Sequence, residues 1–258
     1  MQRAFDDILR KPVLDREDIR ILLSAEGAQT ESLLRRGLEV KLAHLDNYVH
    51  LRGLIEYGNI CEKNCLYCGL RTGNGKVARY CLSDAEVLDC ARLAHELGYG
   101  SVALQSGERS DPAFIDKIEY LVREIKRIDG GSLGITLSLG EQSKETYRRW
   151  FEAGAHRYLL RIESSDEELY YKIHPRNDRH SFRRRLDCLE SLKSIGYQTG
   201  TGVMVGLPFQ TLDHLAGDLL FFRRMDVAMV GLGPSSRIRI RPCIGTKISF
   251  LQRRTGWT

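Results

Sequence analysis

The stretch LRGLIEYGNICEKNCLYCGLR, residues 51–71, joins a short apolar run to three closely spaced cysteines. Its first part, residues 51–57, has the length and composition of a buried strand. Cys61, Cys65 and Cys68 follow at once, with the spacing C-x3-C-x2-C. We therefore expect the cysteines to lie on the first loop after a strand, at the strand's carboxyl end.

Beyond this stretch, short apolar runs alternate with longer amphipathic segments. Further candidate strands lie at residues 101–105, 133–138, 157–163, 201–205 and 226–232. The segments between them carry helix start signals, such as a capping box at Ser83 and a capping aspartate before Pro112. A strand followed by a helix, repeated along the chain, predicts parallel strands joined by right-handed crossovers.

Two α/β architectures fit this alternation, a doubly wound sheet and a barrel. The predicted strands end in polar, glycine-rich stretches, which are typical of a barrel whose βα loops build a site. We therefore predict a TIM-type (β/α) barrel, complete or partial, in residues 51–234. Residues 1–50 predict helices instead, one of them beginning after the capping residue Asp15.

The composition is that of an ordinary soluble globular protein, because 42% of the 258 residues are hydrophobic and 28% are charged. No apolar run approaches the ~20 residues of a membrane span, and the first residues have no signal-peptide core. We expect a cytoplasmic chain with no membrane partner. Seven cysteines in a reducing compartment indicate metal binding, catalysis or burial rather than disulfides.

The net charge of +5 originates in the last part of the chain. Residues 235–258 contain no acidic residue and six basic ones, which are Arg237, Arg239, Arg241, Lys247, Arg253 and Arg254. Taking these six from the total of 39 leaves 33 basic residues against 34 acidic ones. The body of the chain is therefore not basic, and we expect no nucleic-acid partner.

Three thiolates are one ligand short of the four that complete a zinc site or an iron–sulfur cluster. Zinc stays open as an alternative, although no second cysteine pair follows at a suitable spacing. A cubane cluster held by three cysteines would leave one iron open to the amino and carboxylate groups of S-adenosylmethionine (SAM). Reduction would then split the sulfonium and give a 5′-deoxyadenosyl radical, which is chemistry that cofactors carry.

The spacing C-x3-C-x2-C, with the aromatic Tyr67 just before the third cysteine, resembles the signature of the radical SAM superfamily. The remaining cysteines fit other environments. Cys90 and Cys188 lie among apolar residues of predicted helices, so we expect both to be buried. Cys81 lies in a predicted loop and has no evident partner.

Alternation within RYLLRIE, residues 157–163, places Leu160 and Ile162 on one face and Arg161 and Glu163 on the other. If the apolar pair faces the helices, the two charges point into the barrel. There they would bind a zwitterion, such as the amino-carboxylate group of methionine, or simply pair with each other. The same parity turns Ser138 inward on the third strand.

Six segments extend the resemblance over about residues 50–234. In chain order they are NCLYCGLR, VALQSGE, TLSLGE, AGAHRYLLRIE, SFRRRLDCLESLKSIGYQTGTGVMVGLPFQT and DVAMVGLGP. Together they resemble the radical SAM maturases that assemble the H-cluster of [FeFe]-hydrogenase. Methylornithine synthase and biotin synthase are relatives of that family. The resemblance implies a radical SAM barrel.

The resemblance also implies a role for each matching residue. The residues that correspond to cluster ligands are Cys61, Cys65 and Cys68, with Tyr67 beside them in the motif. Those that correspond to SAM-binding positions are Ser106, Gly107, Glu108, Arg161, Glu163 and Arg185. Ser138 corresponds to a position near the substrate. HPRNDRH, residues 174–180, is longer than the family's usual connection before the segment that contains Arg185.

The implied activity is the reductive cleavage of SAM by a [4Fe-4S] cluster, acting on a small-molecule or organometallic substrate in H-cluster assembly. A reductant protein such as ferredoxin or flavodoxin, and the other hydrogenase maturases, are the implied partners. The alternatives are a methylornithine-synthase-like or biotin-synthase-like enzyme, a zinc-binding module and an inactive truncated remnant.

The last residues depart from the family pattern. The family continues after the sixth strand with F-I-P-H-P-D-T-P-L and about a quarter more chain, whereas this chain reads PSSRIRIRPC from residue 234. One permitted codon choice for this run encodes P-F-I-P-H-P-D-T-P-L once a single C is restored. Our hypothesis is that residues 235–258 are a non-family tail read out of frame. We then expect a barrel truncated after about six strands, and a chain that is poorly soluble or inactive.

Overall fold

The computed structural model describes residues 2–235, which contain one parallel six-stranded sheet. Its strands are β1 (Gly53–Gly58), β2 (Ser101–Ser106), β3 (Gly134–Ser138), β4 (Arg157–Leu159), β5 (Gln198–Val205) and β6 (Met229–Pro234). The order in the sheet equals the order in the chain, and each neighbouring pair is parallel. A doubly wound sheet would place the first strand inside the sheet. The predicted (β/α) barrel order is therefore confirmed, as an open sheet in the described residues.

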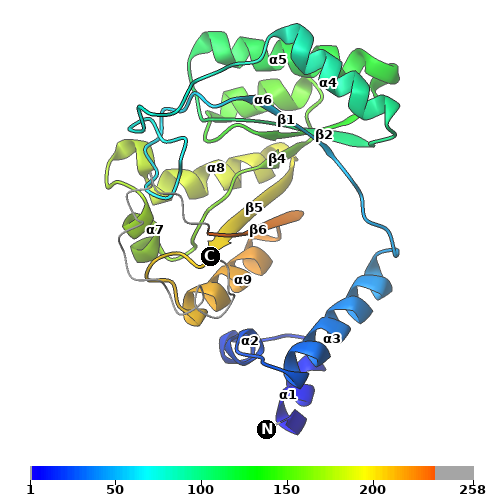
Figure 1. Ribbon diagram of the computed structural model, residues 1–258, viewed down its shortest axis with the longest axis vertical. Helices are drawn as coiled ribbons and strands as arrows, with labels where there is room; N and C mark the ends of the chain where they lie inside the picture. The colour runs from blue at the N-terminus through cyan, green and yellow to red at the C-terminus, as the bar shows by residue number, and fades with distance from the viewer. Residues whose placement is uncertain (1, 236–258) are drawn as a thin grey trace.

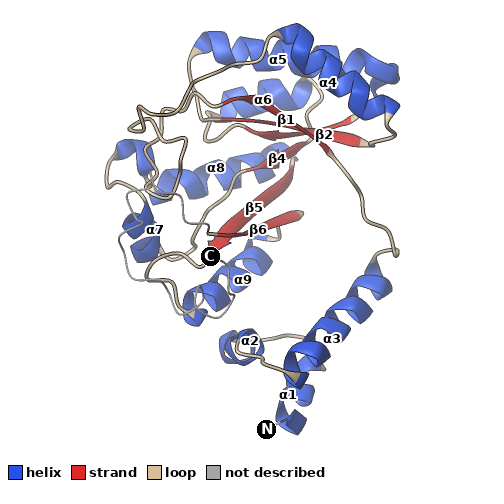
Figure 2. Cartoon of the chain, in the orientation of Figure 1, coloured by secondary structure: helices blue, strands red, loops and turns tan. Residues whose placement is uncertain are grey.

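Helices fill the connections between the strands (Figures 1 and 2). They are α4 (Asp84–Glu96), α5 (Pro112–Arg127), η1 (Ile128–Gly131), α6 (Lys144–Glu152), α7 (Glu167–Ile173), η2 (Asp178–His180), α8 (Phe182–Ile195) and α9 (Leu212–Met225). The predicted capping box of Ser83 with Glu86 is present. At the start of α5 the Asp111 side chain accepts from the backbone N–H of Phe114, and Pro112 is the first residue of the helix. Local start signals thus placed the helices correctly.

The core lies between the outer face of the sheet and the helices α4, α5, α6 and α8. Every second residue of a strand faces these helices, and two such residues, Leu104 and Leu137, are fully buried. Trp150 from α6 stacks on Tyr158 from β4, with ring centroids 6.4 Å apart, and meets Phe114 edge-on at the same distance. This packing of one sheet face against helices leaves residues of the opposite parity on the inner face.

The fourth strand is shorter than predicted, because β4 ends at Leu159 and not at residue 163. The hydroxyl of Thr201 inserts at this point: it donates to the Leu160 carbonyl at 2.8 Å and accepts from the Ile162 N–H at 3.1 Å. A side chain therefore takes the place of a regular ladder bond. Leu160 and Ile162 belong to the core as predicted, and Arg161 and Glu163 line the inner cavity, although Leu160 also contributes to that lining.

One cysteine prediction is wrong, because Cys90 is exposed while Cys188 is buried as expected. The buried stripe of α4 consists of Val87, Ala91 and Ala94, and Cys90 lies on its flank. A stripe of small residues is narrow, so a neighbour about 100° away on the helix reaches solvent. The six described cysteines are all free thiols.

The predicted N-terminal helices are confirmed as α1 (Gln2–Leu9), α2 (Arg16–Leu23) and α3 (Ala28–His44). Figure 1 shows them at the opposite end of the molecule from α4 and α5. Helix α2, capped by Asp15, packs against α9, and Arg16 reaches Asp213 there at 3.0 Å. Within residues 2–235, no helix combines the length and apolarity that a membrane crossing requires. The predicted tail, apart from Ser235, lies outside the described residues.

Candidate functional site

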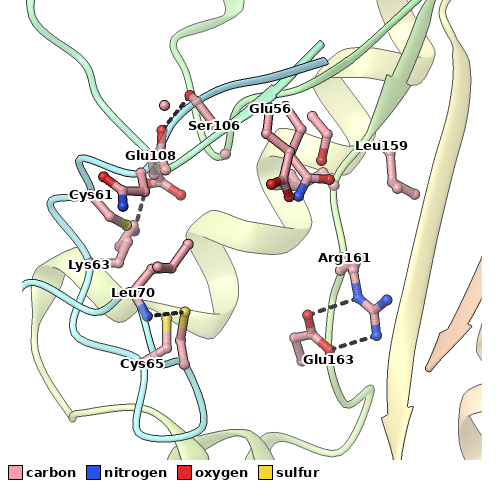
Figure 3. Close-up of a pocket in the computed structure, with 18 of the residues that line it drawn as sticks. Glu56, Cys61, Lys63, Cys65, Leu70, Ser106, Glu108, Leu159, Arg161 and Glu163 are labelled. Atoms are coloured by element: carbon pink, nitrogen blue, oxygen red, sulfur yellow. Dashed lines mark hydrogen bonds and ion pairs between the residues drawn. The ribbon is translucent and has the colours of Figure 1, made fainter. Parts of the chain in front are cut away.

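The carboxyl ends of the strands surround a cavity of about 290 Å³ (Figure 3). The loops that follow β1 and β2, the segment after β4 and helix α8 contribute to its lining. Every residue that the sequence assigned to the cluster, SAM or substrate site lies on this lining, namely Cys61, Cys65, Tyr67, Cys68, Ser106, Gly107, Glu108, Ser138, Arg161, Glu163 and Arg185. The fold thus brings together residues that are up to 124 positions apart in the chain (61 to 185).

The three cysteines lie in different degrees of burial on the loop after β1. Cys65 is buried, whereas Cys61 and Cys68 are half-buried. Burial raises the pKa of the Cys65 thiol to about 12, and it also raises the pKa of Cys61. The thiolate forms of Cys61 and Cys65, which are the forms that bind metals, are therefore unfavourable here without a neighbouring positive charge.

No three His, Cys, Asp or Glu side chains in residues 2–235 converge as the ligands of a single metal ion would. The ligands of a zinc ion would have to converge in this way, because they all lie about 2.0–2.3 Å from one ion.

The loop between the cysteines and β1 packs tightly on residue 107. Gly107 donates its N–H to the Gly58 carbonyl at 3.1 Å, and the Glu62 N–H donates to the Glu108 carbonyl at 2.9 Å. A Cβ atom built at position 107 would lie 2.2 Å from the carbonyl oxygen of Ile60. Glycine is therefore required here for close backbone approach, which explains this residue of the Ser-Gly-Glu stretch in physical terms.

A buried ionic network connects the cysteine loop with the rest of the cavity wall. The Lys63 ammonium lies 3.0 Å from Glu108 and 2.9 Å from Glu141. The Arg185 guanidinium lies 2.5 Å from Glu141 and 3.9 Å from the second oxygen of Glu108, and it also donates to the Arg161 carbonyl at 2.9 Å. Two buried cations thus face two carboxylates in an enclosed space, and the exposed Arg184 guanidinium lies 3.5 Å from Glu141 at its edge.

The two carboxylates of this network differ in their pKa. Burial raises the pKa of Glu108 above its usual range, although Arg185 and Lys63 oppose the rise. Burial acts in the same sense on Glu141, but there Arg185 and Lys63 outweigh it, and the pKa lies below its usual value. Glu141 is therefore the carboxylate that most needs the two cations.

Sequence reasoning missed Lys63 and Glu141 as parts of the site. Lys63 lies between two cysteines, and nothing in its neighbours indicates that an ammonium group would be buried there. Glu141 follows Gly140, which has no Cβ and so leaves the space that the Glu108 side chain fills, since a Cβ atom there would lie 2.3 Å from Glu108. The TLSLGE segment was a usable signal, because Glu141 ends it.

Arg161 and Glu163 form an ion pair with each other, with 2.9 Å between Nε and Oε1 (Figure 3). Glu163 is buried and has a φ of 63°, a conformation that costs a non-glycine residue of order 1 kcal/mol or more. Burial raises the pKa of its carboxyl group, against the opposing charge of Arg161. A strained, buried carboxylate on a cavity wall is typical of a ligand-binding position.

The inner sheet face carries a row of polar side chains on three neighbouring strands. Glu56 pairs in register with Gln105, and Gln105 pairs with Ser138. All three line the cavity, and Figure 3 shows Glu56 across it from Cys65. Sequence reasoning found Ser138 but missed Glu56 and Gln105, although the same alternation could have indicated them. The row offers polar groups to a molecule bound between the sheet and the cysteine loop.

Asp218 of α9 holds the turn that follows Glu163. Its Oδ1 accepts from the Ser165 N–H at 2.7 Å, while its Oδ2 has no hydrogen-bond partner in the part of the chain that the structure describes. Only 1% of the residue is exposed, and burial raises the pKa of the carboxyl group to about 6. The ionisation of Asp218 with pH therefore acts on the hydrogen bond that holds the backbone of Ser165, two residues after Glu163.

We expect Asp218→Asn to remove a specific pH dependence of stability. Because the folded pKa of about 6 exceeds the ordinary value of 3.8, the native state binds more protons than the unfolded state between these values. The contribution of Asp218 to the free energy of unfolding is then fully present below about pH 4 and is lost as the pH rises to about 6. The total loss is about 3 kcal/mol, at ~1.4 kcal/mol per pH unit. Asparagine keeps an acceptor for Ser165 and does not ionise.

Urea unfolding of both proteins at pH 4.5 and pH 7 measures this difference. The variant should gain about 2 kcal/mol relative to the wild type between the two pH values, because about 1 kcal/mol of the difference is already present at pH 4.5. Asp89→Asn, at an exposed position on α4, serves as the matched control and should leave the wild-type pH dependence unchanged. Parallel curves for wild type and Asp218→Asn would show that Asp218 titrates normally.

Comparison with known proteins gives a family match. Residues 55–222 match the radical SAM superfamily. The chain is 46% identical over 205 residues to the [FeFe] hydrogenase maturase subunit HydE of Thermotoga maritima, an alignment that covers 79% of this chain and 57% of that protein. It is 28% identical over 190 residues to the biotin synthase of Magnetococcus marinus, covering 72% of this chain and 57% of that protein.

Among solved structures, the crystal structure of methylornithine synthase superposes on the chain with a TM-score of 0.85 and 25% sequence identity. This superposition covers 96% of the chain and 72% of that structure. The chain spans less than two thirds of the length of the two curated relatives named above. The cysteine loop, the residues that line the cavity and strands β2 to β5 all lie within the matched residues 55–222.

Proposed function

The chain belongs to the radical SAM superfamily, and from this membership we propose that it binds a [4Fe-4S] cluster and SAM and acts in assembly of the [FeFe]-hydrogenase H-cluster. The observation that carries the proposal is the placement of Cys61, Cys65 and Cys68 on one cavity with Glu163 and Arg185. The high identity to a hydrogenase maturase supports the choice of pathway over the wider superfamily.

In this proposal the three cysteines hold the cluster, and the buried cations near them keep the site electrically balanced. When bound, the cluster and SAM supply the reductive cleavage that yields a 5′-deoxyadenosyl radical. Glu163 and Arg161 already form a pair of opposite charges on the wall, which suits the amino and carboxylate groups of a zwitterion. Ser106, Gly107 and Glu108 shape the wall on the β2 side, beside the cysteine loop, and Tyr67 lies within that loop.

Arg185 has a second task in the proposal, because it is already committed to Glu141 and to the Arg161 carbonyl. It therefore orients the segment that carries Arg161 and Glu163, and it brings positive charge to the end of the cavity where the cysteines lie. Water is excluded from this corner, since Glu141, Glu163 and Arg185 are all buried. Electrostatic interactions with a bound ligand are stronger in such an enclosed place.

The substrate would be a small-molecule or organometallic compound that contacts Ser138 and its neighbours Glu56 and Gln105 on the inner face. A ferredoxin or flavodoxin as reductant, other hydrogenase maturases as partners and a cytoplasmic location complete the proposal. We assign the catalytic role to residues 51–234 and treat α1–α3 as a separate N-terminal helical segment. These assignments are consistent with the cavity's position between the strands and the cysteine loop.

A second candidate is a mutase that resembles methylornithine synthase, and the TM-score of 0.85 to that enzyme's crystal structure favours it. The two candidates share the cysteine loop and differ in the substrate on the inner face. An assay with lysine as substrate separates them, because a mutase of this kind would accumulate 3-methylornithine. Absence of that product, with SAM cleavage intact, favours the maturase.

We expect Glu163→Ala to weaken SAM binding about tenfold to a hundredfold, while the iron content per chain stays near the wild-type value. The physical reason is the loss of a charged hydrogen-bonding partner for the ligand, which is worth about 1.5–3 kcal/mol. Isothermal titration of the reconstituted protein with SAM measures the affinity, and iron analysis measures the cluster.

Glu167→Ala is the matched control for this experiment, because Glu167 is an exposed glutamate four residues further along the chain. That variant should bind SAM like the wild type. Equal loss of iron and SAM binding in Glu163→Ala would instead assign Glu163 to the integrity of the fold around the cluster.

A further inference from the structure

The cysteine loop, residues 59–72, lies against the segment between α7 and α8, residues 173–180, which we call the docking segment (Figure 1). We propose that His180 is a positioning residue that fixes the backbone around Cys65 through a hydrogen bond from the Asn64 N–H. The proposal rests on the proposed function only in that Cys65 is a cluster ligand. The contact itself is independent of the cluster.

Three bonds join the loop to the docking segment at adjacent points. The Asn64 N–H donates to Nε2 of His180 at 2.8 Å, and the Leu66 N–H donates to the Ile173 carbonyl at 2.9 Å. The Lys63 ammonium donates to the Arg179 carbonyl. The first two bonds flank Cys65 directly on either side, so they fix the backbone that carries the most buried of the three thiols.

The imidazole of His180 is itself held in one orientation. Its Nδ1 lies 2.7 Å from the side-chain oxygen of Asn177, and its backbone N–H donates to the Asn177 carbonyl at 3.0 Å. An amide oxygen is only an acceptor, so Nδ1 must carry the proton and Nε2 must be the lone-pair acceptor. This is the tautomer that the Asn64 N–H requires. Only 2% of His180 is exposed, so water cannot readily replace either partner.

The charge state of His180 agrees with this geometry. Burial, followed by the positive charge of Lys63, lowers the pKa of His180 to about 4. The ring is therefore neutral at neutral pH, and its Nε2 stays available as an acceptor. An aromatic contact also joins the cysteine loop to the docking segment, because the ring of Tyr67 meets the ring of His174 edge-on with centroids 5.2 Å apart.

The consequence for cluster binding follows from loop entropy. Each backbone residue that must be fixed costs about 1–2 kcal/mol, and the three cysteines lie within one irregular loop. Bonds that fix the loop on a buried segment reduce the cost that remains when the cysteines bind iron. Groups that orient metal ligands from the next layer typically change metal affinity about tenfold to a hundredfold when they are removed.

The test compares His180→Leu with His180→Gln, using hydrogen exchange of the Asn64 and Leu66 amides before and after anaerobic cluster reconstitution. Leucine fills the space but cannot accept a hydrogen bond, whereas the side-chain oxygen of glutamine can. We expect His180→Leu to lose at least tenfold of the amide protection and to bind iron and sulfide about tenfold more weakly. His180→Gln should retain most of both.

His44→Leu, at an exposed position near the end of α3, is the matched control and should behave like the wild type. Unchanged exchange and iron binding in His180→Leu would overturn the proposal. Equal losses in the leucine and glutamine variants would also overturn it, because the ring would then act by packing and not as an acceptor. Failure of the wild type to bind a cluster would contradict the proposed function. The comparison of amide hydrogen exchange without the cluster would still test whether His180 fixes the cysteine loop.

Discussion

Replacement of Cys65 by alanine is expected to abolish the formation of 5′-deoxyadenosine from SAM, to below about a hundredth of the wild-type rate. Cys65 is the most buried of the three cavity thiols, and its neighbours Asn64 and Leu66 are both bonded to the docking segment. A cluster that loses this ligand retains only two protein thiolates, which are too few to hold the cubane. Chromatography of the anaerobic reaction measures the product.

Cys90→Ala provides the matched control for the loss of a thiol, because Cys90 is exposed on α4 and lies outside the cavity lining. It should retain wild-type iron content and product formation. Full activity of Cys65→Ala, or an equal loss in Cys90→Ala, would disprove the assignment of Cys65 as a cluster ligand.

A second large effect is expected from Glu141→Gln, which should lower the free energy of unfolding by about 3 kcal/mol or more. The substitution keeps the side-chain shape but leaves Lys63 and Arg185 with Glu108 as their one carboxylate in the network. Removing one partner of a buried ionic network leaves an uncompensated charge away from water, which is costly. Urea unfolding with a fluorescence readout measures the change.

Glu145→Gln is the control, because Glu145 is exposed on α6 and pairs with Arg148 at the surface. Exposed pairs contribute about 1 kcal/mol or less, so this variant should unfold close to the wild type. A loss below about 1 kcal/mol in Glu141→Gln would mean that water or Glu108 compensates the cations. The network would then have little part in anchoring the cysteine loop.

The network and the docking segment act on the same loop from two directions. Lys63 joins the loop to Glu108 after β2 and to Glu141 after β3. His180 and Ile173 hold the next residues of the loop from the region between α7 and α8. The cysteines are thus placed by contacts with three separate parts of the chain, which is how a loop without regular structure acquires a defined position.

The order of elements and the location of the site could be predicted from the sequence, because both depend on local signals. Apolar runs of strand length and capping residues such as Ser83 and Asp111 are short-range features. The cysteine spacing is also local. Since parallel strands present their carboxyl ends at one edge, residues placed just after successive strands must meet there.

Long-range charge pairing could not be predicted from the sequence. Lys63 meets Glu141 across 78 positions, and Asn64 meets His180 across 116. Many carboxylates and histidines are possible partners at such separations, and only the packed fold selects one of them. The early end of β4 has a similar cause, because it depends on the hydroxyl of Thr201, a residue of the neighbouring strand.

Anaerobic reconstitution with iron and sulfide, followed by reduction in the presence of SAM, tests the central claim most directly. The measured quantities are iron and acid-labile sulfide per chain and the amount of 5′-deoxyadenosine formed. We predict close to four irons and four sulfides per chain, as a cubane cluster requires, and product that depends on the reductant. Zinc without acid-labile sulfide would contradict the assignment of this cavity to radical SAM chemistry, whereas a full cluster without 5′-deoxyadenosine is the result expected if the barrel truncated after six strands is inactive.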